Sequence, residues 1–477
     1  MLFNSFDFAV FLPVVFFLYW FVTKKSLKLQ NLLIVFASYL FYGWWDYRFL
    51  SLIIFSSLVD YTIGRALGKT NDEKRRKFLL WLSIVVNLGF LGFFKYYNFF
   101  LENFRSAFSF FGHEFDGYTL NIILPVGISF YTFQTLSYTI DVYKRQLEPT
   151  KDIVAFLAFV SFFPQLVAGP IERATNLLPQ FYDKRSFSYR NAVNGTRQIL
   201  WGLFKKVVIA DQCAEYVNLI FDNSADHGGI TLILGAFLFA FQIYGDFSGY
   251  SDIAIGTSKL FGFDLMQNFA YPYFSRDIAE FWRRWHISLS TWFRDYLYIP
   301  LGGSRGGLWM KVRNTFIIFL VSGFWHGANW TFIVWGGLNA IYFLPLLLSK
   351  KNRANIDIVA NDSVFPSWKE MGQILVTFIL TILAWVFFRA EDLNHAFSYL
   401  YGIFSQLQAP LDYAPWSLFI FLLFFLLVEW MGRREKFALE RLGADWKLGF
   451  RWAFYFVICL CIIGCMDNQQ DFIYFQF

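Results

Sequence analysis

The sequence predicts an all-α, polytopic membrane protein, and three observations support this fold class. Apolar residues make up 57% of the 477 residues and charged residues only 16%, whereas soluble domains carry about 25% charged residues. Aromatic residues reach 23%, which is typical of lipid-facing surfaces and interfacial belts. The net charge of +6 comes from short basic clusters between apolar runs, whereas a nucleic-acid binder shows a continuous basic face. Soluble, disordered and nucleic-acid-binding proteins are therefore excluded.

Apolar stretches long enough to cross a bilayer recur along the whole chain. Some are overlong or interrupted by glycine, proline and polar residues, so we expect about 11 to 13 transmembrane or re-entrant helices. We expect them to form one membrane domain, residues 1–477. The first lacks a basic n-region and is interpreted as a transmembrane helix, not a signal peptide. The expected spans lie near 6–23, 29–45, 49–66, 78–96, 120–142, 152–169, 197–221, 229–262, 314–330, 331–348, 372–389, 414–431 and 450–466.

The distribution of lysine and arginine predicts the orientation of these spans, because cytoplasmic loops carry the basic excess. Acidic or neutral loops at Phe221–His227 and Glu391–Asp412 are then outside. Both termini, including the tail 466–477, are expected on the extracytoplasmic side. The basic clusters assigned to the cytoplasm lie at 24–28, 74–77, 144–145, 184–185, 305–313, 350–353 and 433–434.

The segment 271–313 is rich in arginine and tryptophan and offers no clean apolar run of 18 residues. Apolar residues within it follow helical spacing, and a polar stripe occupies the adjacent face. This combination is typical of an amphipathic helix at a membrane interface. We expect the segment to lie at the cytoplasmic surface or to re-enter from it. The apolar stripe comprises Ile278, Trp282, Trp285, Leu289, Trp292 and Tyr296, and the polar stripe Arg283, His286, Ser290 and Arg294.

The strongest local signal is the run Ser322–Trp330, which places His326 between two apolar stretches. A histidine at membrane depth is a functional candidate. Desolvation disfavours the imidazolium form, so the side chain would keep a nitrogen free for general-base catalysis. Gly323 and Gly327 would let another backbone or a substrate approach closely. The residues alone leave catalysis and helix packing equally open.

The other histidines carry weaker signals. For His286, a catalytic role and an interfacial side chain facing lipid headgroups are both open. His113, His227 and His395 fall in loops that are expected to be extracytoplasmic, where we expect them to be solvated.

Two carboxylates, in the run Tyr244–Asp252, lie inside an apolar stretch. Carboxylates at this depth need internal partners or a water-filled cavity. Asp246 and Asp252 could therefore line a tunnel or orient a histidine, or they could form structural ion pairs with Arg283, Arg284 or Arg294. The structural interpretation is slightly favoured.

Segments 125–127 and 164–173 contain prolines and are interpreted as broken helices or re-entrant turns. The sequence offers no metal-ligand set, phosphate-binding glycine loop or serine nucleophile elbow. Three of the four cysteines lie in one apolar stretch, and we expect them to pack as small hydrophobic residues.

These motifs together resemble the membrane-bound O-acyltransferase family, in the bacterial branch that includes the membrane subunits of alginate and peptidoglycan O-acetylation. The resemblance runs through most of the chain, with several long motifs in the family's order. The motifs are Pro125–Phe130, Pro164–Arg173, Asp246–Asp252, Phe281–Ser290, Arg294–Gly303, Phe324–Gly327 and Phe472–Phe477.

The resemblance implies a ring of tilted helices around a central tunnel, with a cytoplasmic funnel for the acyl donor. It implies that His326 is catalytic and that His286 lines the same site. Tyr474 matches the C-terminal tyrosine that receives the acyl group in this branch. The implied setting is the bacterial cytoplasmic (inner) membrane, with an extracytoplasmic acyltransferase as partner and an exported polysaccharide as acceptor.

The expected reaction combines both lines of reasoning. Acetyl-CoA, or another acyl thioester, docks from the cytoplasm as donor substrate, with no tightly bound cofactor. Neutral His326 removes a proton from the attacking hydroxyl, and the acyl group moves from sulfur to oxygen. Arg283, Arg294 and Ser290 would bind the donor phosphates, although a stripe facing solvent or headgroups is also open. Asn329 is assigned to the tunnel wall or to a structural role.

Two alternatives stay open. One is transfer of D-alanine or another acyl group from a carrier protein. The other is an ion-coupled transporter that uses Asp246 and Asp252. Transporters of this kind usually contain paired repeats, and the run around these aspartates has no second copy in the sequence.

Overall fold

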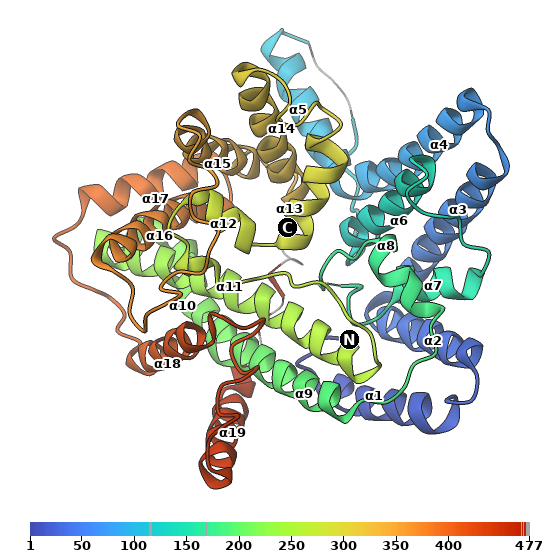
Figure 1. The fold of residues 1–477 in the computed structure, drawn as a ribbon. Helices are drawn as coiled ribbons and strands as arrows, with labels where there is room; N and C mark the ends of the chain where they lie inside the picture. Colours follow the sequence, from blue (N-terminus) through green and yellow to red (C-terminus); the bar gives the residue numbers. More distant parts are fainter. Residues whose placement is uncertain (114–116, 168, 469, 471, 474–477) are drawn as a thin grey trace. The chain divides into compact units, whose positions relative to one another are not determined.

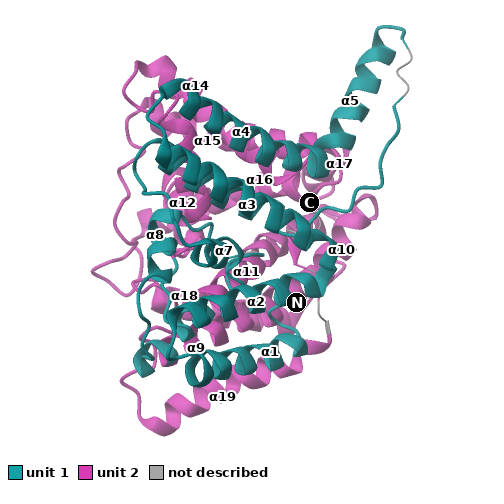
Figure 2. Cartoon of the chain, turned by 90° about the vertical axis from the view of Figure 1, so that its right-hand side faces the viewer, with its two compact units in different colours: residues 1–192, 257–265 teal, residues 193–256, 266–477 magenta. Residues whose placement is uncertain are grey.

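The computed structural model describes residues 1–113, 117–167, 169–468, 470, 472 and 473. Every regular element within these residues is helical, which confirms the predicted all-α class. They form two compact units, coloured separately in Figure 2. Unit 1 comprises 1–192 and 257–265, and unit 2 comprises 193–256 and 266–477. The assignment of the whole chain to one domain stays a prediction.

Long apolar helices identify the chain as a membrane protein. Among the described residues, five helical stretches are long and apolar enough to cross a bilayer, and three shorter apolar helices accompany them. The predicted stretches 120–142 and 152–169 are helical only in part, and the full number of spans stays a prediction. The five are Leu27–Lys69, Glu73–Phe110, Gly229–Leu260, Trp330–Leu348 and Trp368–Arg389, and the shorter ones Phe6–Val22, Trp416–Gly432 and Leu448–Gly464.

Unit 1 buries a carboxylate among neutral donors. Asp60 accepts hydrogen bonds from Ser83, Asn87 and Thr139 on neighbouring helices, which is how polar groups are satisfied in an apolar interior. Helix α5 extends away from the rest of this unit (Figure 2). The elements are α1 (Phe6–Phe17), η1 (Leu18–Val22), α2 (Leu27–Asp46), η2 (Tyr47–Phe49), α3 (Leu50–Lys69), α4 (Glu73–Leu91), η3 (Gly92–Tyr96), α5 (Tyr97–Phe110), α6 (Ile128–Tyr143), α7 (Ile153–Ser161), α8 (Ala174–Leu177) and η4 (Leu178–Phe181).

The two proline-containing segments, predicted to be broken helices or re-entrant turns, lie outside the helices of unit 1: 125–127 precedes α6, and 164–173 lies between α7 and α8. Helix α6 begins only after Gly127, which has a positive φ of 75°. A Cβ there would lie 2.8 Å from the carbonyl oxygen of Leu166, so only glycine allows this approach. Helix α7 ends at Ser161, and turns follow it.

Unit 2, which carries helices α10 and α12–α19 of Figure 1, contains every predicted site residue that the structure describes. Helices α9 and α11 each cross a boundary between the units, since 189–192 and 257–260 belong to unit 1. The elements are α9 (Tyr189–Leu203), η5 (Phe204–Ala210), α10 (Asp211–Asp222), η6 (Ser224–Asp226), α11 (Gly229–Leu260), η7 (Pro272–Phe274), α12 (Ile278–Arg284), α13 (Ile287–Phe293), η8 (Arg294–Tyr298), α14 (Leu308–His326), α15 (Trp330–Leu348), α16 (Trp368–Arg389), α17 (Leu393–Ser405), α18 (Trp416–Gly432), α19 (Leu448–Gly464) and η9 (Met466–Asn468).

Glycines bring α9 and η5 very close to α11. A Cβ on Gly202 would lie 2.6 Å from the carbonyl oxygen of Gly249, and a Cβ on Gly245 would lie 2.9 Å from that of Lys205. Small residues at such crossings are typical of membrane helices, because packing there depends on close contact. This crossing sets the lysines of η5 against the carboxylates of α11.

Helices α14 and α15 form a second close pair. A Cβ on Gly323 would lie 2.2 Å from the carbonyl oxygen of Phe332, and one on Gly336 would lie 2.3 Å from that of Phe319. The close approach of another backbone, expected beside His326, is therefore present. It fixes the end of α14, where this histidine lies.

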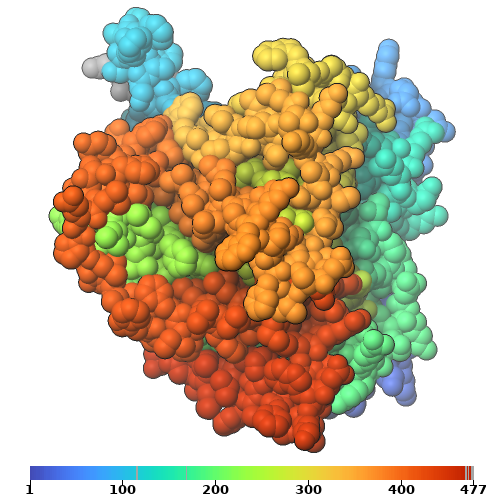
Figure 3. All heavy atoms as spheres, turned by 60° about the vertical axis from the view of Figure 1, so that its left-hand side comes forward, coloured from blue at the N-terminus to red at the C-terminus, as the bar shows by residue number. Residues whose placement is uncertain are grey.

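The N-terminal end of α11 lies beside the C-terminal end of α17, which Figure 3 shows as light green against orange. The amide of Gly229 donates a 2.9 Å hydrogen bond to the carbonyl of Gln406. Helix α11 is largely buried inside the chain, and it carries Asp246 and Asp252.

Candidate functional site

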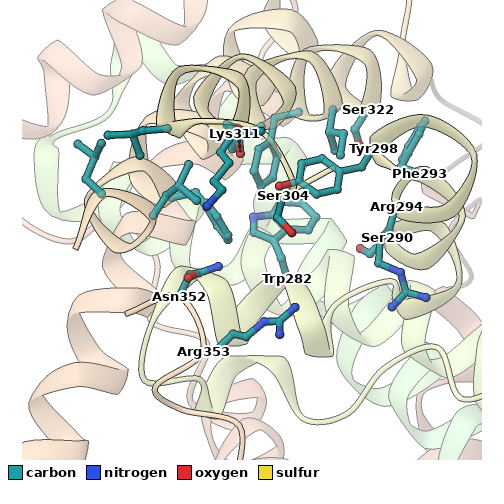
Figure 4. Close-up of a pocket in the computed structure, with 18 of the residues that line it drawn as sticks. Trp282, Ser290, Phe293, Arg294, Tyr298, Ser304, Lys311, Ser322, Asn352 and Arg353 are labelled. Atoms are coloured by element: carbon teal, nitrogen blue, oxygen red, sulfur yellow. Dashed lines mark hydrogen bonds between the residues drawn. The ribbon is translucent and has the colours of Figure 1, made fainter. Parts of the chain in front are cut away.

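A cavity of about 860 Å³ opens between α13, η8, α14 and α15 in unit 2 (Figure 4). Such a volume is typical of small-molecule binding sites. One part of its wall is apolar, with Trp282, Leu289, Phe293, Phe319 and Phe343.

Basic side chains form another part of the wall. The described residues that line the cavity include four cations and no carboxylate. In Figure 4, Lys311 and Arg353 come from different sides of the cavity, and Ser290 and Arg294 stand together at one flank. Arg294 and Ser290 therefore lie where donor binding was predicted, whereas Lys311, Lys350 and Arg353 were not predicted.

Arg283 departs from the prediction, because it is not among the residues that line the cavity. Its guanidinium donates hydrogen bonds to the carbonyls of Asn352, at 2.8 Å, and Asn355, at 2.5 Å. Asn352 and Arg353 line the cavity. Arg283 thus holds their loop, and its role in donor binding stays a prediction.

The prediction of one continuous amphipathic helix across 278–296 is also wrong. The chain ends α12 at Arg284 and begins α13 at Ile287, with His286 at a positive φ of 44°. The physical reason is a long-range main-chain pairing. The amide of Ala270 donates to the carbonyl of Arg284, and the amide of Ile287 donates to the carbonyl of Asn268, both at 2.9 Å.

Because of this break, the side chain of His286 points into the protein interior. Its side chain is 1% exposed, so the interpretation as an interfacial group facing lipid headgroups is wrong. Nδ1 lies 3.2 Å from Oδ1 of Asn268, which also accepts from the hydroxyl of Ser288. An amide oxygen favours the tautomer with the proton on Nδ1, leaving the lone pair on Nε2. Nε2 is buried and has no hydrogen-bond partner among the described residues.

His326 ends α14 and is 5% exposed. Its ring contacts the indole of Trp335, with centroids 5.1 Å apart. Trp335 in turn lies 5.6 Å from Trp282, which lines the cavity. Ser322, one helical turn before His326, also lines it. His326 itself does not line the cavity, and its ring lies behind the wall that Trp282 and Ser322 form.

The two predicted histidines come together around one indole. The ring of Trp325 lies 4.9 Å from His326 and 6.2 Å from His286, measured between centroids. In the described part of the chain, no group of three or more His, Cys, Asp or Glu side chains could hold a metal ion. The remaining histidines lie elsewhere: His113 is exposed, and His227 and His395 are only half-buried, not fully solvated as expected.

The carboxylates of α11 pair with lysines of η5, and the arginine partners suggested by the sequence are wrong. Asp246 lies 2.8 Å from Nζ of Lys206, and Asp252 lies 2.9 Å from Nζ of Lys205. The second pair also includes Glu429, 3.3 Å from Lys205. Sequence reasoning missed both lysines, although a lysine pair inside the apolar stretch 197–221 was a visible signal.

Asn329 has a capping role. Its side chain caps α15 by accepting from the amide of Thr331, and it donates a 2.7 Å hydrogen bond to the carbonyl of Glu391. It therefore fixes the turn that follows His326.

Two described residues of the C-terminal tail lie in the interior of unit 2. Phe472 and Ile473 are 0% and 1% exposed. The ring of Phe472 packs at a tilt against that of Tyr250, with centroids 4.3 Å apart, and lies 6.2 Å from Phe247. Phe247 lies 4.6 Å from His286. Tyr474, predicted to receive the acyl group, lies outside the described residues.

Comparison with known proteins relates this arrangement to an enzyme family. The membrane-bound O-acyltransferase family matches residues 144–388, a range that contains both histidines and the whole cavity. A probable alginate O-acetylase of Azotobacter vinelandii is 41% identical over 401 residues, which cover 83% of this chain and 76% of the relative. Another from Pseudomonas putida is 36% identical over 98% of both chains. A peptidoglycan O-acetyltransferase of Helicobacter pylori is 38% identical over 84% of this chain and 80% of its own.

Proposed function

Because the chain belongs to the membrane-bound O-acyltransferase family, and is therefore an acyltransferase, we propose that it moves an acetyl group across the membrane for O-acetylation of an exported polysaccharide. The donor is acetyl-CoA or another acetyl thioester on the cytoplasmic side. The relatives named for alginate and peptidoglycan O-acetylation support acetyl as the acyl group. D-alanyl transfer and ion transport are the weaker alternatives.

One observation carries this proposal: contacts lead from His326 in two directions. Through Trp335 and Trp282 they reach the cavity. Through Trp325 and His286 they reach Phe247, which contacts the C-terminal tail. A histidine between a cavity and a chain terminus can act on a group from each.

The chemistry of the cavity favours a phosphorylated thioester. Its cations offer charge-assisted hydrogen bonds to phosphate, and its aromatic wall suits a pantetheine arm. Lys311, Lys350 and Arg353 belong to the clusters 305–313 and 350–353, which the positive-inside rule assigns to the cytoplasm. We therefore place the cavity opening on the side where acyl thioesters are made.

In the proposed reaction, His326 acts as general base. Burial disfavours the imidazolium form, so the neutral ring can take the proton of the attacking hydroxyl. That oxygen attacks the thioester carbonyl, the carbon–sulfur bond breaks, and the leaving thiolate receives the proton from His326. The products are an acetyl ester and a free thiol.

The hydroxyl is assigned to Tyr474. A tyrosine hydroxyl has a reference pKa near 10, so it needs a base to react at neutral pH. Two observations support this assignment: Ile473, the preceding residue, is buried, and Phe472 contacts the aromatic ring beside His286. An extracytoplasmic acyltransferase partner would then take the acetyl group and pass it to the polysaccharide. In this proposal the chain lies in the cytoplasmic membrane with both termini outside.

The test uses the purified full chain in lipid vesicles with acetyl-CoA labelled in the acetyl group. We expect release of free CoA and a label on the C-terminal peptide, detected by mass spectrometry. D-alanine from a carrier protein in place of acetyl would support the alternative acyl group. A protein that releases no thiol from either donor but moves ions across the vesicle membrane would be a transporter.

A further inference from the structure

Unit 2 contains a buried charge cluster that the proposed reaction does not use. Lys206, in η5, lies 2.8 Å from Asp246 of α11 and 2.8 Å from Asp211 of α10. All three side chains are buried. Removing charges from water is costly unless ion pairs and hydrogen bonds satisfy them fully. The remaining hydrogen-bonding groups of this cluster therefore need partners.

Those partners come from the main chain of the C-terminal tail. The ammonium of Lys206 donates a 3.1 Å hydrogen bond to the carbonyl of Gln470. The amide of Ile473 donates a 2.7 Å hydrogen bond to Oδ2 of Asp246. Phe472, between these two points, is fully buried against Tyr250. The cluster thus contacts the tail at two places three residues apart.

A neighbouring cluster provides a contrast within the same helices. Lys205 pairs with Asp252 and Glu429. Its carboxylates are completed by side chains from α9 and α11, because Gln198 donates to Asp252, and Trp201 and Tyr244 donate to Glu429. The hydrogen bonds described here for the Lys205 cluster come from side chains, whereas the Lys206 cluster also forms hydrogen bonds with the main chain of the tail.

We infer that Lys206 and Asp246 form a clamp that holds the main chain of the C-terminal tail inside unit 2, next to the histidine site. Both contacts are made to backbone atoms of the tail, and the buried ring of Phe472 adds a side-chain contact between them. Lys206 and Asp246 are positioning residues. This inference rests on the proposed function only for the role of the clamped segment, which ends one residue before Tyr474.

The clamp has a direct test in the exchange of backbone amides with deuterium. In the wild-type chain in lipid nanodiscs, the amide of Ile473, followed within the peptide 466–477, should exchange slowly, because it is buried and bonded to Asp246. Asp246→Ala removes the acceptor but leaves Lys206 paired with Asp211, so no buried cation is stranded. Loss of this hydrogen bond to a charged group should speed the exchange of the Ile473 amide by about tenfold or more.

Matched variants separate the clamp from a general loosening of the fold. Asp246→Asn keeps an amide oxygen that can accept from Ile473, and should restore most of the protection. Asp252→Ala breaks the neighbouring ion pair in the same helix and should leave exchange of the tail within about twofold of wild type. Unchanged exchange in Asp246→Ala, or an equal increase in Asp252→Ala, would overturn the clamp.

A second measurement distinguishes the clamp from the proposed reaction. In Asp246→Ala, release of free thiol by hydrolysis of the thioester should persist, because His326 is untouched, while acetyl on the C-terminal peptide should fall by about tenfold. Equal loss of both would overturn the positioning role. If the wild-type tail is protected as expected but never carries acetyl, the clamp stands and the assignment of Tyr474 fails.

Discussion

His286 and His326 pack against the same indole ring, although 40 positions separate them in the sequence. Trp325 contacts His326 at 4.9 Å and His286 at 6.2 Å between ring centroids. The two imidazoles come from different settings, since one ends the long helix α14 and the other occupies the break between α12 and α13. Their common neighbour brings the two imidazoles into the same region of unit 2.

The first prediction concerns the base. His326→Ala should lower acetyl transfer by about 10²–10⁴-fold, the usual cost of removing a general base. Membrane insertion and yield should not change, because the deletion leaves the α14–α15 glycine contacts in place. The measurement is release of thiol from acetyl-CoA by the purified variant. His113→Ala, which alters an exposed histidine of unit 1, is the control. A well-folded His326→Ala protein with near wild-type transfer would end the assignment.

The second prediction concerns the cations of the cavity. Arg294→Ala and Lys311→Ala should each raise the KM for acetyl-CoA by about tenfold, because each removes a charge-assisted contact to phosphate. High salt should reproduce the effect. An acetyl thioester of N-acetylcysteamine, which has no phosphate, should be affected little by either change.

Arg305→Ala provides the matched control for these variants. Arg305 belongs to the same basic cluster but does not line the cavity, so its loss should leave both KM values unchanged. Equal losses with the two donors in Arg294→Ala would assign that residue a structural role.

The third prediction concerns the crossing of α14 and α15. Gly323→Ala should destabilise the protein by about 1–3 kcal/mol, the usual cost of overpacking, because its Cβ would meet the carbonyl of Phe332 at 2.2 Å. It should also reduce transfer, since the same turn of helix carries His326. Gly337→Ala is the control, because a Cβ there finds only Leu320 at 3.8 Å. Thermal unfolding in detergent measures the stability of both variants. Equal melting temperatures of Gly323→Ala and Gly337→Ala would contradict this role for the crossing.

Long apolar runs made most of the fold predictable. In lipid, a chain must form the hydrogen bonds of its backbone internally, so an apolar run such as 372–389 is expected to form a helix. The structure has α16 there, at Trp368–Arg389. The histidine at the end of α14 could be found for a related reason, because a polar ring between two apolar runs is conspicuous.

The break at His286 could not be read from local sequence. The apolar stripe from Ile278 to Tyr296 keeps helical spacing throughout, and neither glycine nor proline marks the interruption. The cause is a pairing with the main chain near Asn268, almost twenty residues earlier. The partners of Asp246 were missed because Lys206, forty residues away, reaches it only through the glycine-mediated contact of η5 with α11.

The last prediction concerns Tyr474, to which the resemblance to the family assigns the role of acyl acceptor. Tyr474→Phe keeps the ring and removes only the hydroxyl. An aromatic anchor at a membrane interface would tolerate this change, whereas a nucleophile would not. We expect the variant to fold and to retain the slow amide exchange of its C-terminal peptide, because the contacts of Gln470 and Ile473 with the Lys206–Asp246 clamp are unaffected. Acetyl on that peptide and acetylation of the polysaccharide should both disappear. Hydrolysis of the thioester should continue, since the donor cavity and His326 are intact. Full polysaccharide acetylation by the Phe variant would leave Tyr474 as an anchor and require another hydroxyl to receive the acetyl group.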